Sequence, residues 1–253
     1  HCGCIGSEGA DPKNLGFDIN IAGSAIGSPG SYYGENGYGA IKGAKSRAVP
    51  GLEQYFHTNT FLSDALTLEA DKEIEKAVAE KRPFYLNMAH YAVHSPFETD
   101  KRFIGHYTDP KKNQQACAFA TLIEGMDKSL GDLMDKLEEL GIAENTLIIF
   151  LGDNGGDAPL GGAADYGSSA PFKGKKGSEY EGGVRVPFIV AWAHPDEGNK
   201  FQKAFPVAQN AIQTQMGTVM DIYPTVLSVA GVKVPENHIL DGSTLERMIA
   251  GKK

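Results

Sequence analysis

Residues 146–157 read TLIIFLGDNGGD, and this stretch decides which fold the sequence predicts. Its five consecutive apolar residues, LIIFL, predict a strand buried on both faces, as in parallel sheets that are covered by helices. Ligands of such sheets lie at the carboxyl ends of the strands, where Asp153 and Asn154 follow. Their side-chain oxygens suit a hard cation such as calcium or magnesium, and the two glycines behind them permit a tight turn. Taken alone, the stretch also fits an ordinary turn, because Asp, Asn and Gly dominate turns.

Helical and strand patterns alternate around this strand. Apolar residues recur every four positions in the first helical pattern, at Leu66, Ala70, Ile74 and Val78. The second helical pattern is closed by Gly141 in the C-cap position. The alternation predicts an α/β fold in which a largely parallel central sheet is sandwiched by helices. The predicted elements are helices at 62–81, 114–140 and 221–230 and strands at 84–89, 146–151 and 188–192.

The composition limits the classes of partner. The chain has 253 residues, of which 41% are hydrophobic, enough for one large domain or for a domain plus a small appendage. A formal charge of −8 argues against nucleic acid or an anionic membrane surface as the main partner. No apolar run approaches the roughly 20 residues that cross a bilayer. Cys2, Cys4 and Cys117 do not make a disulfide framework, and Cys117 is predicted to be a small buried apolar group.

Polar groups suited to one task follow the predicted strands. His94 lies in AVHSP after the strand at 84–89, and lysines crowd the run FKGKKGS at 172–178. A metal held by Asp153 and Asn154 beside a lysine and a histidine would receive a tetrahedral oxyanion, because cation and ammonium neutralise its charge while the imidazole moves a proton. A loop histidine and a solvated run of lysines are the alternatives. Structural roles are expected for His90, Glu181 and Arg185.

A long glycine- and tyrosine-rich segment runs from Ile21 to Gly51, and loops of that length are usually functional or disordered. Its tyrosines, together with Tyr55 nearby, suggest two interpretations. They could stack on sugar rings in a carbohydrate subsite, or they could cover the hydrophobic core of the domain. The tyrosines concerned are Tyr32, Tyr33, Tyr38 and Tyr55.

Taken together, the segments resemble the sulfatases of the alkaline-phosphatase-like superfamily. The likeness begins at PKNLGFD, residues 12–18, and covers nearly the whole chain in the order of the family. Each motif is weak by itself, and their common order carries the resemblance. The motifs are PFYLNMAHYAVHSPFE at 83–98, NTLIIFLGDNGG at 145–156, PFKGKKGSEYEGGVRVPFIVAW at 171–192, DIYPTVLSVAGVKVP at 221–235 and LDGSTL at 240–245.

The resemblance implies an enzyme that hydrolyses sulfate monoesters of small molecules or glycans. It implies that His94 and Lys176 bind the substrate and act in catalysis, and that Asp153 and Asn154 bind Ca²⁺. Residues 1–253 would then be a portion of a sulfatase catalytic domain with an incomplete alkaline-phosphatase-like fold. A periplasmic, secreted or lysosomal location is expected from the family, while the oligomeric state stays open.

The sequence departs from the family pattern in four places. The Cys/Ser-x-Pro-x-Arg motif, whose first residue becomes the formylglycine nucleophile, is absent, and so is the N-terminal pair of calcium-binding aspartates. The opening HCGCIG resembles the family stretch His-x-Gly-Lys-Trp-His-x-Gly with its central Lys-Trp-His replaced by Cys4. The resemblance also implies a small C-terminal sheet domain, and the sequence stops at Gly251-Lys-Lys before it. The chain is therefore expected to be truncated at both ends and inactive alone. The alternatives are a phosphate or phosphonate ester hydrolase of the same superfamily and a non-catalytic module that binds anions or glycans.

Overall fold

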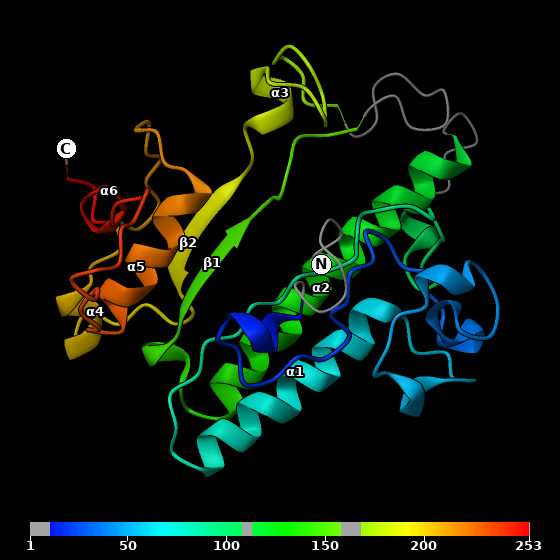
Figure 1. The fold of residues 1–253 in the computed structure, drawn as a ribbon, viewed down its shortest axis with the longest axis horizontal. Helices are drawn as coiled ribbons and strands as arrows, with labels where there is room; N and C mark the ends of the chain where they lie inside the picture. The colour runs from blue at the N-terminus through cyan, green and yellow to red at the C-terminus, as the bar shows by residue number, and fades with distance from the viewer. Residues whose placement is uncertain (1–10, 108–112, 158–167, 253) are drawn as a thin grey trace. The chain divides into compact units, whose positions relative to one another are not determined.

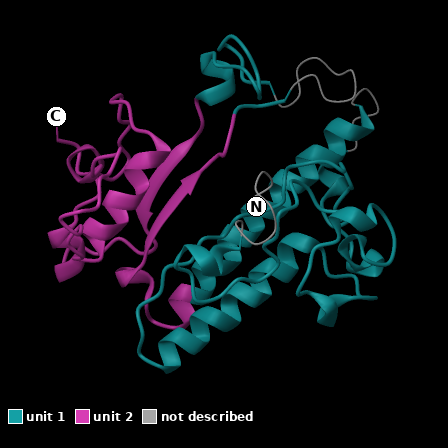
Figure 2. Ribbon diagram, viewed as in Figure 1, with its two compact units in different colours: residues 1–136, 155–184 teal, residues 137–154, 185–253 magenta. Residues whose placement is uncertain are grey.

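The structure is a computed structural model that describes residues 11–107, 113–157 and 168–252. The chain divides into two compact units (Figure 2). Unit 1 comprises residues 1–136 and 155–184, and unit 2 comprises residues 137–154 and 185–253. The predictions made for Cys2 and Cys4 lie outside the described residues.

Two long helices lie side by side, α1 from Leu62 to Ala79 and α2 from Gln114 to Glu139 (Figure 1). All of α1, and α2 as far as Lys136, belong to unit 1. The Thr67 and Ser129 hydroxyls, 2.5 Å apart, connect them, and so does an ion pair of 2.9 Å between Lys136 and Glu75. Both helices were predicted within two residues of these bounds. Gly141 follows α2 with a φ of +67°, and the Schellman hydrogen bonds Gly141 N–H to Glu138 O and Ile142 N–H to Leu137 O confirm its capping role.

The buried face of α1 departs from the predicted spacing of four. Leu66, Ala70 and Ile74 are buried as predicted, but Ala77 is buried in place of Val78, which is half-buried. A helix has 3.6 residues per turn, so a strict step of four drifts off the core face over three turns. Cys117, on α2, is buried and free, as predicted.

The segment from Ile21 to Gly51 forms much of the hydrophobic core of unit 1 instead of a solvated loop. Tyr32 and Tyr38 are both 0% exposed, and Tyr32 stacks on Phe61 with ring centroids 5.5 Å apart. The interpretation that the tyrosines cover the core is therefore right for these two. Short 3-10 helices shape the chain at 12–15, 34–39, 45–47 and 53–55, and another lies at 104–107. The buried core cluster consists of Ala22, Tyr32, Tyr38, Val49, Leu52, Phe61, Leu62, Ala65, Leu66, Tyr91 and Leu122.

The strand predicted at 84–89 is absent: these residues form no regular secondary structure and pair with no strand in the described part of the chain. Phe84, Tyr85 and Leu86 expose large parts of their side chains. An extended segment becomes a strand only when a neighbouring backbone supplies its hydrogen bonds, and the apolar pattern cannot report whether that neighbour is present.

Unit 2 contains strands β1, from Leu147 to Leu151, and β2, from Phe188 to Trp192, as predicted. They pair antiparallel in the register Leu147 with Trp192 through Leu151 with Phe188, so the described residues contain no parallel pair. The prediction that these strands are buried on both faces was wrong. All residues of β1 are half-buried, and Ile189 in β2 is 59% exposed. An apolar run predicts a strand whose faces can be covered by other elements. The described residues of unit 2 cover the two strands only in part.

The core of unit 2 lies where short helices meet the end of β2. Trp192 packs with Phe205, Leu245 and Ile249, and its indole N–H donates to Phe205 O at 3.2 Å. Asp221 joins two of the quoted motifs, because its carboxylate accepts the backbone N–H groups of Thr218 at 2.7 Å and Ser243 at 2.8 Å. The helices are α4 at Lys200–Ala204, α5 at Ile222–Val229 and α6 at Glu246–Ile249, with 3-10 turns at 143–145 and 219–221.

Candidate functional site

Glycines bring two parts of the lysine-rich loop into backbone contact in unit 1. The N–H of Gly155 donates to Gly183 O at 2.9 Å, and that of Gly182 donates to Lys173 O at 2.8 Å. A Cβ on Gly155 would overlap the carbonyl group of Gly182, and one on Gly182 would overlap the Gly174 carbonyl. The short helix α3, from Glu181 to Val184, begins at this contact. The glycines therefore serve close packing of backbones, rather than only the tight turn predicted after Asn154.

Lys176 is tied to the end of the DNGG stretch by its backbone. Its N–H donates to Gly156 O at 2.9 Å, and the preceding glycine is held by α3 through Gly183. Gly156 is two residues after Asn154 in the chain. The loop packing thus fixes the backbone of Lys176 next to the glycines that follow the predicted metal ligands.

The three lysines of the loop differ in their surroundings. The ammonium of Lys173 lies 4.0 Å from the ring centroid of Tyr180, and that of Lys175 pairs with Asp157 Oδ1 at 3.3 Å. Lys176 is half-buried, whereas the other two are exposed. Across the described ranges, no ion-pair partner is found for the Lys176 ammonium. A solvated run of charge fits Lys173 and Lys175, but not the half-buried Lys176.

Asp153 and Asn154 follow β1 directly, as predicted, with Asp153 exposed and Asn154 half-buried. The strand pairing extends one step past β1, since Gly152 N–H donates to Pro187 O at 3.2 Å and so fixes the chain just before Asp153. Within the described part of the chain, no three His, Cys, Asp or Glu side chains cluster as a metal site. Calcium takes six to eight oxygens. Asp153 and Asn154 supply two side-chain donors, fewer than such a shell needs.

His94 lies in a turn of unit 1 and is half-buried. Its backbone N–H donates to Tyr91 O at 2.9 Å, which closes the turn over 91–94. In the ring, Nδ1 lies 3.2 Å from both Ser95 Oγ and Ser95 O. Contacts at Nδ1 orient an imidazole through that nitrogen.

His90, four residues earlier, faces the helices. Its Nε2 lies 3.4 Å from Ser129 Oγ, and its buried Nδ1 has no hydrogen-bond partner among the described residues. Burial lowers the pKa of His90 to about 4, because desolvation disfavours the charged ring. The structural role expected for His90 agrees with this position against α2.

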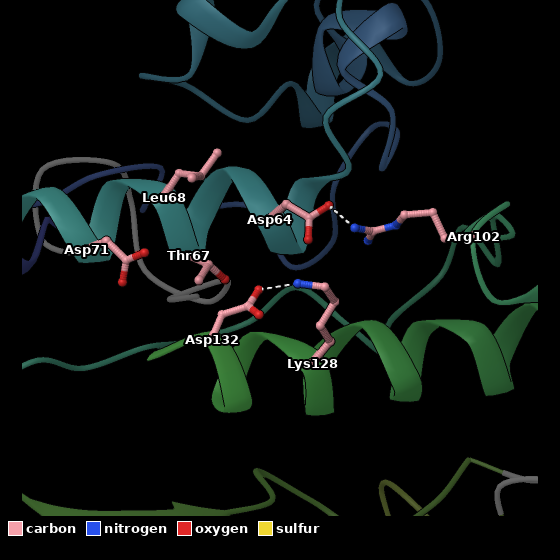
Figure 3. A pocket seen from close by; sticks show the side chains of 7 residues that line it. All are labelled: Asp64, Thr67, Leu68, Asp71, Arg102, Lys128 and Asp132. Atoms are coloured by element: carbon pink, nitrogen blue, oxygen red, sulfur yellow. Dashed lines mark hydrogen bonds and ion pairs between the residues drawn. The ribbon is translucent and has the colours of Figure 1, made fainter. Parts of the chain in front are cut away.

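A separate pocket of about 370 Å³ lies between α1 and α2 (Figure 3). Arg102 in its wall pairs with Asp64 at 2.8 Å, and Lys128 pairs with Asp132 (Figure 3). Burial raises the pKa of Asp64, and the nearby guanidinium opposes that rise. None of the predicted site residues lines this pocket, whose walls are Asp64, Thr67, Leu68, Asp71, Arg102, Lys128 and Asp132.

Comparison with known proteins identifies relatives for most of the chain. The family profile described as Sulfatase matches residues 8–232. Human steryl-sulfatase is 33% identical over 194 residues, which are 76% of this chain and 30% of that protein. Mouse N-acetylgalactosamine-6-sulfatase is 31% identical over 192 residues, 76% of this chain and 33% of that protein. The chain thus spans about a third of the length of these curated relatives.

Comparison with solved structures also identifies sulfatases as relatives. The crystal structure of Ps i-CgsB matches with a TM-score of 0.68 and 28% identity, over 88% of this chain and 48% of that one. The PsFucS1 sulfatase from Pseudoalteromonas sp. matches with a TM-score of 0.58 and 30% identity, over 76% of this chain and 35% of that one. These neighbours support the α/β, alkaline-phosphatase-like fold class. With a family profile over residues 8–232 and relatives that are sulfatases by sequence and by structure, this chain belongs to the sulfatase family.

Proposed function

We propose that this chain carries part of the active site of an enzyme that hydrolyses sulfate monoesters. In this proposal Lys176 and His94 bind the sulfate ester and act in catalysis, and Asp153 and Asn154 bind Ca²⁺. Family membership supports the reaction class. The chain would form a portion of the catalytic domain, with β1 belonging to a larger and largely parallel sheet.

The observation that carries the proposal is the contrast between Lys176 and its neighbours. Lys173 and Lys175 engage Tyr180 and Asp157, whereas Lys176 is half-buried and tied by its backbone to Gly156. A half-buried ammonium on a fixed backbone stabilises an anion more strongly than a mobile surface lysine, because less solvent screens it and less reorganisation is needed. A sulfate oxygen is a suitable partner for such a charge.

Asp153 and Asn154 would give a carboxylate and an amide oxygen to the calcium ion, the hard donors that it prefers. Bound there, calcium would neutralise the negative charge of the sulfate group. Asp153 is exposed and therefore accessible to an ion and to further ligands. Oxygens beyond these two are needed to complete the shell.

His94 is proposed to pass a proton to the oxygen of the departing alcohol from Nε2, while Ser95 contacts Nδ1. Protonation of that oxygen prevents the release of an unstable alkoxide. The nucleophile motif Cys/Ser-x-Pro-x-Arg does not occur in the 253 residues. These residues therefore account for binding, charge stabilisation and proton transfer, and the formylglycine expected of the family would supply the attack on sulfur.

Sulfated glycans are the proposed substrate class. The similarity to N-acetylgalactosamine-6-sulfatase supports a glycan, and the structure of Ps i-CgsB was also solved in complex with k-i-k-neocarrahexaose. The similarity to steryl-sulfatase keeps a small sulfated molecule as the second candidate. A periplasmic, secreted or lysosomal location is proposed from the family alone. In the described ranges, no helix has both the length and the apolar character for a membrane crossing.

The proposal is tested by joining a nucleophile-bearing sulfatase segment ahead of this chain and co-expressing the formylglycine-generating enzyme. Release of sulfate from an aryl sulfate is measured beside release of phosphate from the matching aryl phosphate. Calcium-dependent turnover of the sulfate, at least about tenfold slower in Lys176→Ala, is expected from the loss of one charge contact. Preference for the phosphate would favour the phosphatase alternative. Tight binding of sulfated glycan without turnover would favour a binding module.

A further inference from the structure

A buried tyrosine hydrogen-bonds to the backbone of the turn that carries His94. The Tyr32 hydroxyl lies 2.8 Å from Tyr91 O and 2.7 Å from His94 O, the two carbonyls at the ends of the 91–94 turn. One hydroxyl proton is thus shared between two acceptors. Tyr91 O also accepts the His94 N–H, so both ends of the turn converge on the same hydroxyl.

The far end of this segment is fixed to the same place in the core. The Glu98 carboxylate accepts the Ser31 hydroxyl at 2.8 Å and the Tyr32 N–H at 2.5 Å. A hydrogen bond to a charged acceptor is among the strong ones. Residues 31 and 32 therefore hold both the start and the end of the stretch from Tyr91 to Glu98.

The tyrosine is suited to act as a permanent donor. Tyr32 is 0% exposed and stacks on Phe61, which fixes its ring. Burial and the nearby Glu98 charge raise the pKa of Tyr32 well above its usual value, so the hydroxyl keeps its proton. Because the Tyr32 hydroxyl is buried, water cannot replace the two carbonyls as its hydrogen-bond acceptors.

We infer that Tyr32, anchored by Glu98, is a positioning residue that sets the orientation of His94. The inference rests on the proposed role of His94 at the sulfate ester. Tyr32 acts on the backbone of the turn and is not itself a ligand for the substrate. Its loss would remove the hydroxyl that binds both end carbonyls of the turn, so the imidazole would sample a wider range of positions.

Tyr38 provides a matched control. It is also 0% exposed, belongs to the same core cluster and donates its hydroxyl to Thr60 O at 3.1 Å. Tyr32→Phe and Tyr38→Phe therefore remove the same atom from the same core. Of the two, Tyr32 alone has its hydroxyl on the carbonyls of the His94 turn.

The test compares both variants of the 253-residue chain by NMR with histidine labelled in ring and backbone, the His94 signals being assigned with His94→Gln. In Tyr32→Phe we expect shifted His94 ring signals and amide exchange at His94 at least about tenfold faster, as the loss of one hydrogen bond predicts. In Tyr38→Phe both should match the wild type. Unchanged His94 signals in folded Tyr32→Phe, or equal changes in both variants, would overturn the inference.

Two further measurements cover a Tyr32→Phe variant that does not fold and separate this inference from the proposed function. If Tyr32→Phe does not fold, Glu98→Gln retains the side-chain shape and weakens the anchor, and it should shift the same His94 signals; no shift would contradict the inference. Inorganic sulfate is titrated into the wild type with calcium present. If Tyr32→Phe moves His94 while sulfate leaves it unaffected, the positioning role stands and the proposed role of His94 at the sulfate fails.

Discussion

The acid sensitivity of unit 1 should depend on His90. This ring is held against Ser129 with a buried Nδ1 that has no partner in the described residues, and burial lowers its pKa to about 4. An unfolded chain exposes the same ring to water, where its pKa is about 6.5. The perturbation is His90→Gln, which removes the titrating group and retains a polar side chain.

The sign follows from the direction of the pKa change. Because the folded pKa lies below the unfolded one, the unfolded chain takes up a proton first as the pH falls. The contribution of the neutral ring to stability is complete above about pH 6.5 and is lost progressively down to about pH 4. Between pH 7.5 and pH 5 the wild type should lose about 2 kcal/mol of unfolding free energy through this residue, and about 3 kcal/mol over the whole range.

Urea unfolding at several pH values measures this loss. Far-UV circular dichroism reports α1 and α2, and the fluorescence of Trp192, the one tryptophan in the sequence, gives an independent signal from unit 2. His194→Gln is the matched control, because His194 is exposed and its bond to Glu138 raises its pKa, which gives the opposite sign. The reasoning is refuted if His90→Gln and the wild type lose equal stability between pH 7.5 and pH 5.

Three further predictions concern the site and its loop. Asp153→Ala should weaken calcium binding at least about tenfold by calorimetry, because a charged ligand is lost, while Asp157→Ala should not; equal affinities would remove Asp153 from the site. Gly155→Ala should lower the unfolding free energy by about 1–3 kcal/mol, since its Cβ overlaps the Gly182 carbonyl, whereas Gly131→Ala, in open space on α2, should raise it by up to about 1 kcal/mol; a neutral Gly155→Ala would contradict the close packing. The 253-residue chain alone should release no sulfate from an aryl sulfate above the buffer control, and calcium-dependent release would demand another nucleophile.

The helices and the two paired strands could be predicted from the sequence because their signals are local. The periodic apolar face of α1 and the glycine after α2 are written in consecutive residues, and so is the run that forms β1. Pairing is a property of two segments. The pattern at 84–89 therefore predicted a strand that has no partner in the described residues, and nothing local indicated that β1 and β2 run antiparallel.

In the candidate site, too, local sequence signals could be predicted and contacts between distant segments could not. The resemblance selected Lys176 by its position before Gly177, and that assignment stays a prediction. The partners of Lys173 and Lys175, Tyr180 and Asp157, could not be predicted from the sequence. Tyr32 could not be found as a positioning residue from the sequence, because the turn it contacts lies about 60 residues away along the chain. A tyrosine in a glycine-rich segment gives no signal that separates a core residue from a sugar-stacking one.

The most direct test of the proposed site is a titration of the chain with inorganic sulfate in the presence of calcium, monitored by NMR at the lysine side chains. Lys176 is expected to show the largest change, and Lys176→Ala should weaken binding at least about tenfold, because the proposed site would lose a half-buried ammonium. Lys173→Ala should bind like the wild type. Equal losses in the two variants, or a response centred on Lys173, would contradict the assignment of the sulfate site to Lys176.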